Sequence, residues 1–129
     1  MIPTIVPAYT AVLALIFIVL AVRVIRLRQR NHVTIGHGDD AEVERMMRVH
    51  ANFAEYVPLA LLLILFAEMQ GRPAWLVNVF CVVLIAGRLV HAYGVSQVKE
   101  DIRLRVAGMA ATFAVLIAAA VSALTQFII

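Results

Sequence analysis

Three polar side chains recur on one face of an otherwise apolar helical segment. Arg48, Asn52 and Glu55 lie at positions i, i+4 and i+7, so in a helix all three project from the same side. The apolar run 59–66 follows almost directly, which places them in or beside a membrane-spanning segment. A charge at that depth is costly and usually faces a protein interior, a partner charge or a polar ligand. This face therefore predicts a binding site.

The composition is that of an integral membrane protein. Of the 129 residues, 64% are hydrophobic, against roughly 45–50% in a soluble domain. The apolar residues form four blocks, and each approaches the roughly 20 residues that a spanning helix needs once the polar ends of the second and third blocks are counted. We expect a single domain, an all-α bundle of four transmembrane helices over about 4–28, 41–70, 74–96 and 103–128.

Basic residues predict how this bundle crosses the membrane. Four arginines follow the first apolar block between positions 23 and 30, and Lys99, Arg103 and Arg105 follow the third. Cytoplasmic loops carry an excess of lysine and arginine, so we expect both basic loops in the cytosol and both termini on the other side. The first block has no basic residue before it, the reverse of a secretory signal, so we expect it to be retained. The net charge of +3 follows from this layout, and nothing in the pattern suggests nucleic acid.

The connecting segments predict helix ends rather than a metal site. His37, Asp39 and Asp40 form no recognisable ligand set, so no metal is expected, and Asp40 is expected to cap the second helix. The turn around Gly71 is expected to end that helix. Glu68 and Arg72 lie near this turn, and their opposite charges leave it with no net charge.

Small residues predict close packing later in the chain. The segment beginning at Gly94 is expected to end the third helix, and small residues from Ala107 to Ala118, Gly108 among them, give the fourth helix a close-packing face. The single Cys81 lies inside the third block, cannot form a disulfide within the chain, and is interpreted as core packing.

The predicted topology gathers polar residues from all four helices at one depth. They are Arg26 from the first helix, Arg45, Arg48, Asn52 and Glu55 from the second, Arg88 and His91 from the third, and Arg105 from the fourth. Arginine binds carboxylates bidentately, so this surplus suits a small anion with more than one carboxylate and an ammonium group. Glutathione has this pattern, with a thiol at its centre.

The thiol suggests the chemistry. The thiolate is the nucleophile, and an arginine cannot accept the thiol proton, so its role is electrostatic stabilisation. Arg105 is the candidate, because the dipole of the fourth helix adds to its own charge. Tyr56 or Tyr93 could donate a hydrogen bond to the sulfur or to a carboxylate. The second substrate would arrive from the bilayer, so we expect a lipophilic electrophile or hydroperoxide.

Structural interpretations remain open beside this one. Glu55 paired with Arg88 or Arg48 would also be an intramembrane ion pair that fixes helix register, and His91 would also be an interfacial residue. The alternative function is a non-catalytic membrane bundle that binds glutathione or an anionic lipid headgroup. A small transporter is disfavoured because the first helix carries no carboxylate.

The same residues resemble the family of membrane-associated proteins in eicosanoid and glutathione metabolism, the MAPEG family. Its second-helix motif is similar to Glu-Arg-x-x-Arg-x-x-x-Asn-x-x-Glu followed by Tyr and Pro. The matching positions here are Glu44, Arg45, Arg48, Asn52, Glu55, Tyr56 and Pro58. Arg88 and His91 resemble the Arg-x-x-His of the prostaglandin synthase branch, and Arg105 resembles the arginine that stabilises the thiolate.

The resemblance implies a homotrimer in which glutathione lies between neighbouring subunits. It implies Arg105 as the catalytic residue. The glutathione-binding residues that it implies are Arg26, Arg48, Asn52, Glu55, Tyr56, Arg88, His91 and Tyr93.

Ala51, Val95 and Val106 stand where the prostaglandin synthase branch has arginine, tyrosine and serine, which argues against that branch's reaction. The short form is most similar to bacterial members, so we expect an inner membrane protein with the family's default transferase or peroxidase activity.

Overall fold

The chain folds into four long helices. The computed structural model describes residues 2–128, without the side chains of residues 126 and 127, and contains α1 (Ile5–Arg30), α2 (Ala41–Met69), α3 (Ala74–Ser96) and α4 (Ile102–Ile128). By length and composition each helix could cross a membrane. The predicted all-α, four-helix membrane fold is confirmed, and the expected bounds differ from these by at most two residues.

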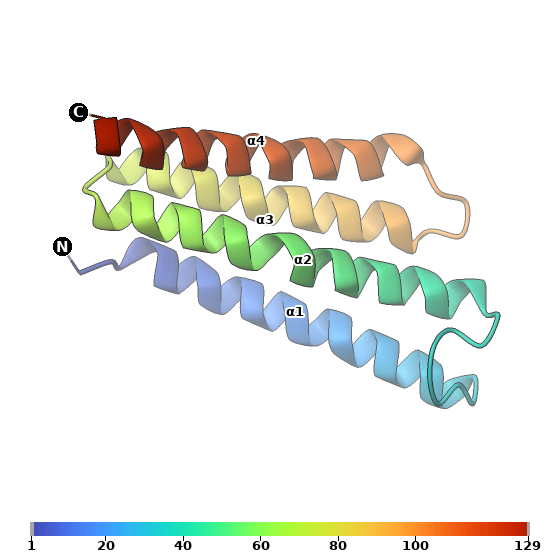
Figure 1. Cartoon of the computed structure of the whole chain (residues 1–129). Helices are drawn as coiled ribbons and strands as arrows, with labels where there is room; N and C mark the ends of the chain where they lie inside the picture. Colours follow the sequence, from blue (N-terminus) through green and yellow to red (C-terminus); the bar gives the residue numbers. More distant parts are fainter. Residues whose placement is uncertain (1, 129) are drawn as a thin grey trace.

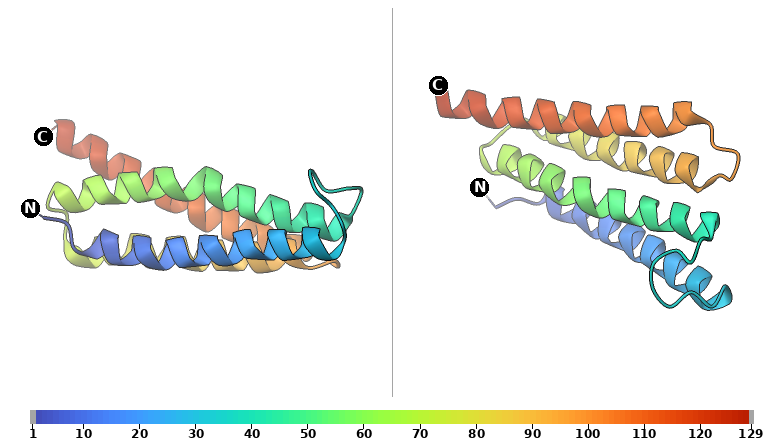
Figure 2. Two further views of the ribbon diagram at one scale, coloured as in Figure 1. Left: turned by 90° about the horizontal axis from the view of Figure 1, so that it is seen from below. Right: turned by 45° about the vertical axis from the view of Figure 1, so that its right-hand side comes forward.

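The helices alternate in direction, so the bundle has two different ends. The two termini and the α2–α3 turn lie at one end, which we call the terminal end, and the α1–α2 and α3–α4 loops lie at the other, which we call the basic end (Figure 1). The pair α2 and α3 stands between α1 and α4, which do not contact each other in the described part of the chain (Figures 1 and 2). The core forms along α2 and α3 and includes Cys81, as expected.

Glycines bring α3 and α4 together. A Cβ at Gly108 would lie 2.6 Å from both the carbonyl oxygen of Gly87 and the Cβ of His91. At Gly94 a Cβ would lie 2.8 Å from the Cβ of Leu104, so this glycine serves close packing, while α3 itself ends at Ser96. Of the small residues expected to form the packing face of the fourth helix, Gly108 and Ala111 are therefore used against α3. Ala107, Ala110, Ala114 and Ala118 are exposed in the protomer.

Glu68 caps a helix other than its own. Its carboxylate accepts hydrogen bonds from the backbone N–H groups of Thr4 and Ile5, both at 2.7 Å, and of Val6 at 2.8 Å. These are orphan donors at the start of α1, where the side chain of Thr4 makes no capping bond. The negative charge also meets the positive end of the α1 dipole. The last turn of α2 therefore holds the first turn of α1.

Arg72 makes the matching contact with α4. One terminal nitrogen of its guanidinium donates to the backbone carbonyl of Ser122 at 2.6 Å and to the Thr125 hydroxyl at 2.7 Å. A cation near the C-terminal turns of a helix is favourable for the same dipole reason. Glu68 and Arg72 do cancel in charge, as expected, but each binds a different neighbouring helix.

Two acids organise the basic end. Asp40 accepts from the backbone N–H groups of Glu42 and Val43, which confirms it as the cap of α2. The hydrogen bond from Val43 lowers the pKa of the Asp40 carboxyl. In the α3–α4 loop, Glu100 forms ion pairs with Arg45 of α2 at 3.0 Å and with Arg105 of α4 at 3.5 Å. The Arg45 contact is the main cause that lowers the pKa of Glu100.

We predict that Glu68→Gln destabilises the fold. The carboxylate is buried and receives three backbone donors, and hydrogen bonds to a charged group contribute about 1.5–3 kcal/mol, so we expect a loss of about 2 kcal/mol. The measurement is unfolding of the detergent-solubilised protein. Asp39→Asn, which removes an acid from an exposed loop position, is the matched control. Equal stability of the two variants would show that the Glu68 contacts do not hold α1.

The ion pairs of Glu100 predict a dependence of stability on pH. Because the folded state lowers the pKa of this carboxyl, its stabilisation is complete above the unfolded value of about 4.3. It is lost as pH falls through the lower folded value. The wild-type protein should therefore have a higher melting temperature than Glu100→Gln at pH 7. This difference in melting temperature should disappear below about pH 4. Melting curves across this range measure it, with Asp101→Asn as control. A difference that persists or grows in acid would contradict the prediction.

Candidate functional site

A charged cavity lies at the basic end where α2, α3 and α4 meet. Its volume is about 230 Å³. Its lining residues come from the first turns of α2, the end of α3, the α3–α4 loop and the start of α4: Ala41, Glu44, Arg45, Arg48, Val95, Glu100 and Arg105. We call it the Arg105 cavity. It brings together Arg48 and Arg105, two of the residues that the sequence analysis assigned to one site.

Glu100 is the acid at the centre of this cavity. Arg45 donates to it and also to the backbone carbonyl of Val95 at 3.2 Å. The Arg105 side chain is half exposed and its contact with Glu100 is long, at 3.5 Å. Arg48 is exposed and forms no ion pair within residues 2–128. Three arginines thus face two acids, and the two predicted site arginines retain donors for an anion.

Deeper in the bundle, Arg88 forms a second cluster. Its side chain is 2% exposed. One terminal nitrogen donates to the amide oxygen of Asn52 at 2.7 Å, and the other contacts the sulfur of Met109 at 3.6 Å. The Nε atom is buried without a partner. No carboxylate of the described residues pairs with this guanidinium, so a cation lies inside the bundle with only neutral partners.

His91 lies one turn further along α3 and is 4% exposed. It packs against Gly108, where the α3 and α4 backbones are closest. The structure therefore brings Asn52, Arg88 and His91 into one buried region. His91 is therefore buried between α3 and α4. The alternative interpretation had placed it at the membrane–water interface.

Four other predicted residues lie elsewhere. Arg26 lines a different cavity, and Tyr93 is 63% exposed on the side of α3 that faces α1. The ring of Tyr56 contacts Phe113 of α4 edge-on, with centroids 5.6 Å apart. Glu55 is exposed and has no ion-pair partner among residues 2–128.

The position of Glu55 corrects one interpretation. Glu55 forms no ion pair with Arg88 or Arg48 in the described part of the chain, and Arg88 is bonded to Asn52 instead. The amide of Asn52, one turn before Glu55, occupies the place on α2 that reaches α3. Helix register is therefore fixed by a hydrogen bond between a charged and a neutral group.

Sequence reasoning missed Glu100 as a site residue. Only the basic residues of this loop were considered, yet Glu100 stands five positions before Arg105 and contacts it. Glu68 carried a clearer signal. An acid in the last turn of a helix opposes that helix's own dipole, so a partner on another element was to be expected.

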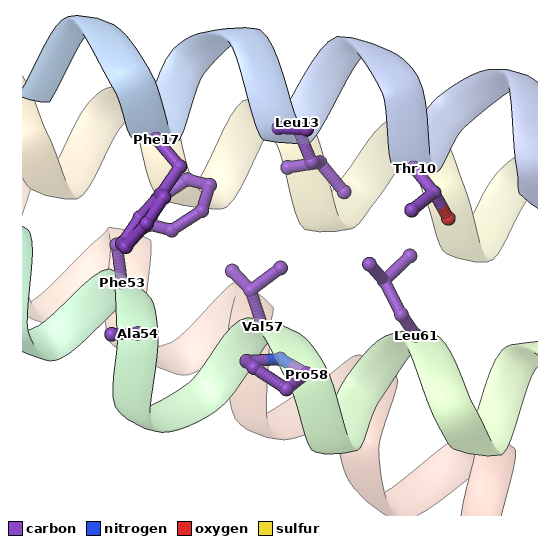
Figure 3. Close-up of a pocket in the computed structure, with 9 residues that line it drawn as sticks. Thr10, Leu13, Phe17, Phe53, Ala54, Val57, Pro58 and Leu61 are labelled. Atoms are coloured by element: carbon purple, nitrogen blue, oxygen red, sulfur yellow. The ribbon is translucent and has the colours of Figure 1, made fainter.

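A largely apolar cavity lies between α1 and α2 further along the bundle. Its volume is about 260 Å³, and the side chains of Leu13 and Phe17 face those of Phe53 and Val57 across it (Figure 3). The hydroxyl of Thr10, at its rim, donates to the carbonyl of Val6 in its own helix. No charged group lines this cavity, so it supplies no part of an anion site.

Comparison with known proteins places the chain in a family. It matches the MAPEG family model over residues 6–125. The inner membrane protein YecN of Escherichia coli K12 is 38% identical over 109 residues, which cover 84% of this chain and 82% of that protein. YecN of Escherichia coli O6:H1 matches to the same extent. With four membrane-length helices and a match over nearly its whole length, the chain is an integral membrane protein that belongs to the MAPEG family.

Proposed function

We propose that the protein is a glutathione-binding membrane enzyme that activates the glutathione thiol. The activated thiol is conjugated to a lipophilic electrophile or reduces a lipophilic hydroperoxide. The observation that carries the proposal is the buried Arg88 guanidinium, which has a neutral partner in Asn52 and no carboxylate within residues 2–128. Burying an ion costs several kcal/mol, and an anionic ligand would offset that cost.

The charges of glutathione fit the two clusters. It has two carboxylates and one ammonium group. Arg48, in the Arg105 cavity, would bind one carboxylate, and Arg88 would bind the other. Glu55, exposed on the same face of α2 as Arg48, would meet the ammonium. Asn52 has a side-chain amide that offers donors as well as the acceptor that Arg88 uses.

Arg105 has the geometry for a role at the sulfur. It lies in the first turn of α4, where the helix dipole favours an anion, and its side chain is half exposed, with one long contact to Glu100. The thiol would release its proton to water, and the sulfur would then attack the electrophile, whose leaving group departs with the bonding electrons. Each unit of lowered thiol pKa corresponds to about 1.4 kcal/mol of thiolate stabilisation.

A homotrimer belongs to this proposal. Arg48 and Glu55 are exposed although they lie on a membrane-length helix. In addition, α1 and α4 do not meet, so a face of α2 stays open within one protomer. Neighbouring protomers would cover that face and shield the charges from lipid. Arg26 and Tyr93 lie apart from the Arg105 cavity in the protomer, so in the trimer they would reach that site only from a neighbouring protomer. We further propose that the basic end faces the cytosol.

Replacing Arg105 tests the proposal. In Arg105→Leu we expect turnover of a lipophilic electrophile such as 1-chloro-2,4-dinitrobenzene to fall at least about tenfold, the effect of losing one unit of thiol pKa depression. Arg105→Lys, which keeps the charge, should retain part of it. Calorimetric titration with glutathione should show a smaller change in affinity than in turnover. Arg103→Leu, two residues away, exposed and outside the cavity, is the control.

The alternative function is distinguished by the same variants. A non-catalytic protein that binds glutathione or a lipid headgroup would lose affinity in Arg105→Leu and show no turnover in any variant. Wild type that neither binds glutathione at millimolar concentration nor turns over the electrophile would contradict the proposal as a whole.

A further inference from the structure

A second basic cavity lies at the basic end, on the other side of the bundle from the Arg105 cavity. Its volume is about 360 Å³. Three arginines of α1 line it together with residues of α2 and α3: Arg23, Arg26, Leu27, Arg30, Glu42, Met46, Ser96 and Gln97. We call it the Arg26 cavity. Glu42 is its one acid, so the lining carries a charge of +2.

The arginines of this cavity are not neutralised within the protomer. Arg23 donates to the hydroxyl of Ser96 at 3.2 Å. None of the three forms an ion pair with a carboxylate within residues 2–128. Their spacing along α1 at positions 23, 26 and 30 keeps them on one face. The cavity is therefore suited to an anion.

An apolar groove runs from this cavity toward the middle of the bundle. It has a volume of about 450 Å³ and lies between α1 and α3. Its lining residues are Val12, Leu15, Ile16, Val19, Leu20, Arg23, Leu89, Ala92 and Tyr93. We call it the α1/α3 groove. Leu15, Val19 and Tyr93 are each more than half exposed, so the groove opens sideways, toward the lipid of a membrane.

The cavity and the groove adjoin at Arg23, which lines both. On α3 the side chain of Gln97, in the cavity, donates to the backbone carbonyl of Tyr93, in the groove. The two adjoining regions thus form a surface with a basic end at the level of the loops and an apolar end inside the membrane-length part of α1 and α3. A tyrosine at the junction is typical of the membrane interface.

We propose that this surface binds an anionic phospholipid. The arginines of the Arg26 cavity would bind the headgroup phosphate, and one acyl chain would lie in the α1/α3 groove. A small soluble phosphate would use the cavity and leave the groove without a role, whereas a lipid accounts for both halves and for the sideways opening. The site is separate from the Arg105 cavity, and the proposal does not depend on glutathione binding.

Native mass spectrometry of the full-length protein in detergent tests the proposal. Phosphatidylglycerol should be retained about fivefold more than phosphatidylcholine, the effect of about one basic side chain at an anionic surface. Arg23→Ala and Arg30→Ala should each remove most of this preference. Val19→Trp, which fills the groove, should lower retention of both lipids. Arg103→Ala and Val121→Trp are the matched controls, since both residues are exposed on α4 and lie outside both regions.

Four results would overturn the proposal. Equal retention of the two lipids would exclude headgroup recognition, and an equal loss in Arg103→Ala would show a diffuse charge effect. A loss in Val121→Trp as large as in Val19→Trp would exclude the groove. Displacement of phosphatidylglycerol by millimolar glycerol phosphate, without an effect of Val19→Trp, would identify a free-phosphate site. Melting temperatures of all variants show that each is folded, and Arg30→Ala replaces Arg23→Ala if the lost Ser96 contact unfolds the latter.

Discussion

The buried guanidinium of Arg88 is the group at which α2, α3 and α4 converge. It reaches Asn52 on α2 and Met109 on α4 from its own place on α3, so one side chain contacts three helices. That convergence is possible because Gly87 and Gly108 let the α3 and α4 backbones touch one residue away from it. A buried charge without an opposite partner is costly to a fold. The cost becomes understandable if the position serves to bind an anion.

The terminal end has a different character, because each of its two charges binds a helix end. Glu68 accepts from three backbone donors at the start of α1, and one terminal nitrogen of Arg72 donates to two acceptors in the last turns of α4. Each charge meets the helix end whose dipole it complements. The two outer helices, which do not contact each other, are thereby held from the same short turn. The charges of this end thus serve the fold, whereas the basic end also carries arginines without a carboxylate partner among residues 2–128, such as Arg48 and Arg88.

The sequence predicted well how far along the bundle axis each side chain lies. It predicted poorly which side of the bundle that side chain faces. Hydrophobic runs and a rise of about 1.5 Å per residue set the level of each side chain, so Arg48 and Arg105 were correctly expected at one level. Arg26 and Tyr93 lie at that level too, but they face the α1/α3 side. Which side a residue faces depends on how the helices pack. That packing depends on the glycine contacts between α3 and α4, which periodicity alone does not give.

The most direct test of the anion site compares wild type with Arg88→Met, which keeps an unbranched side chain and removes the charge. Thermal unfolding in detergent is measured without ligand and with saturating ophthalmic acid, which has the charges of glutathione but no thiol. If Arg88 is kept for ligand binding, Arg88→Met alone should be at least as stable as wild type. It should also lose most of the ligand-induced rise in melting temperature that wild type shows. A variant that is strongly destabilised without ligand, yet still stabilised by ophthalmic acid as wild type is, would show that Arg88 serves only the fold.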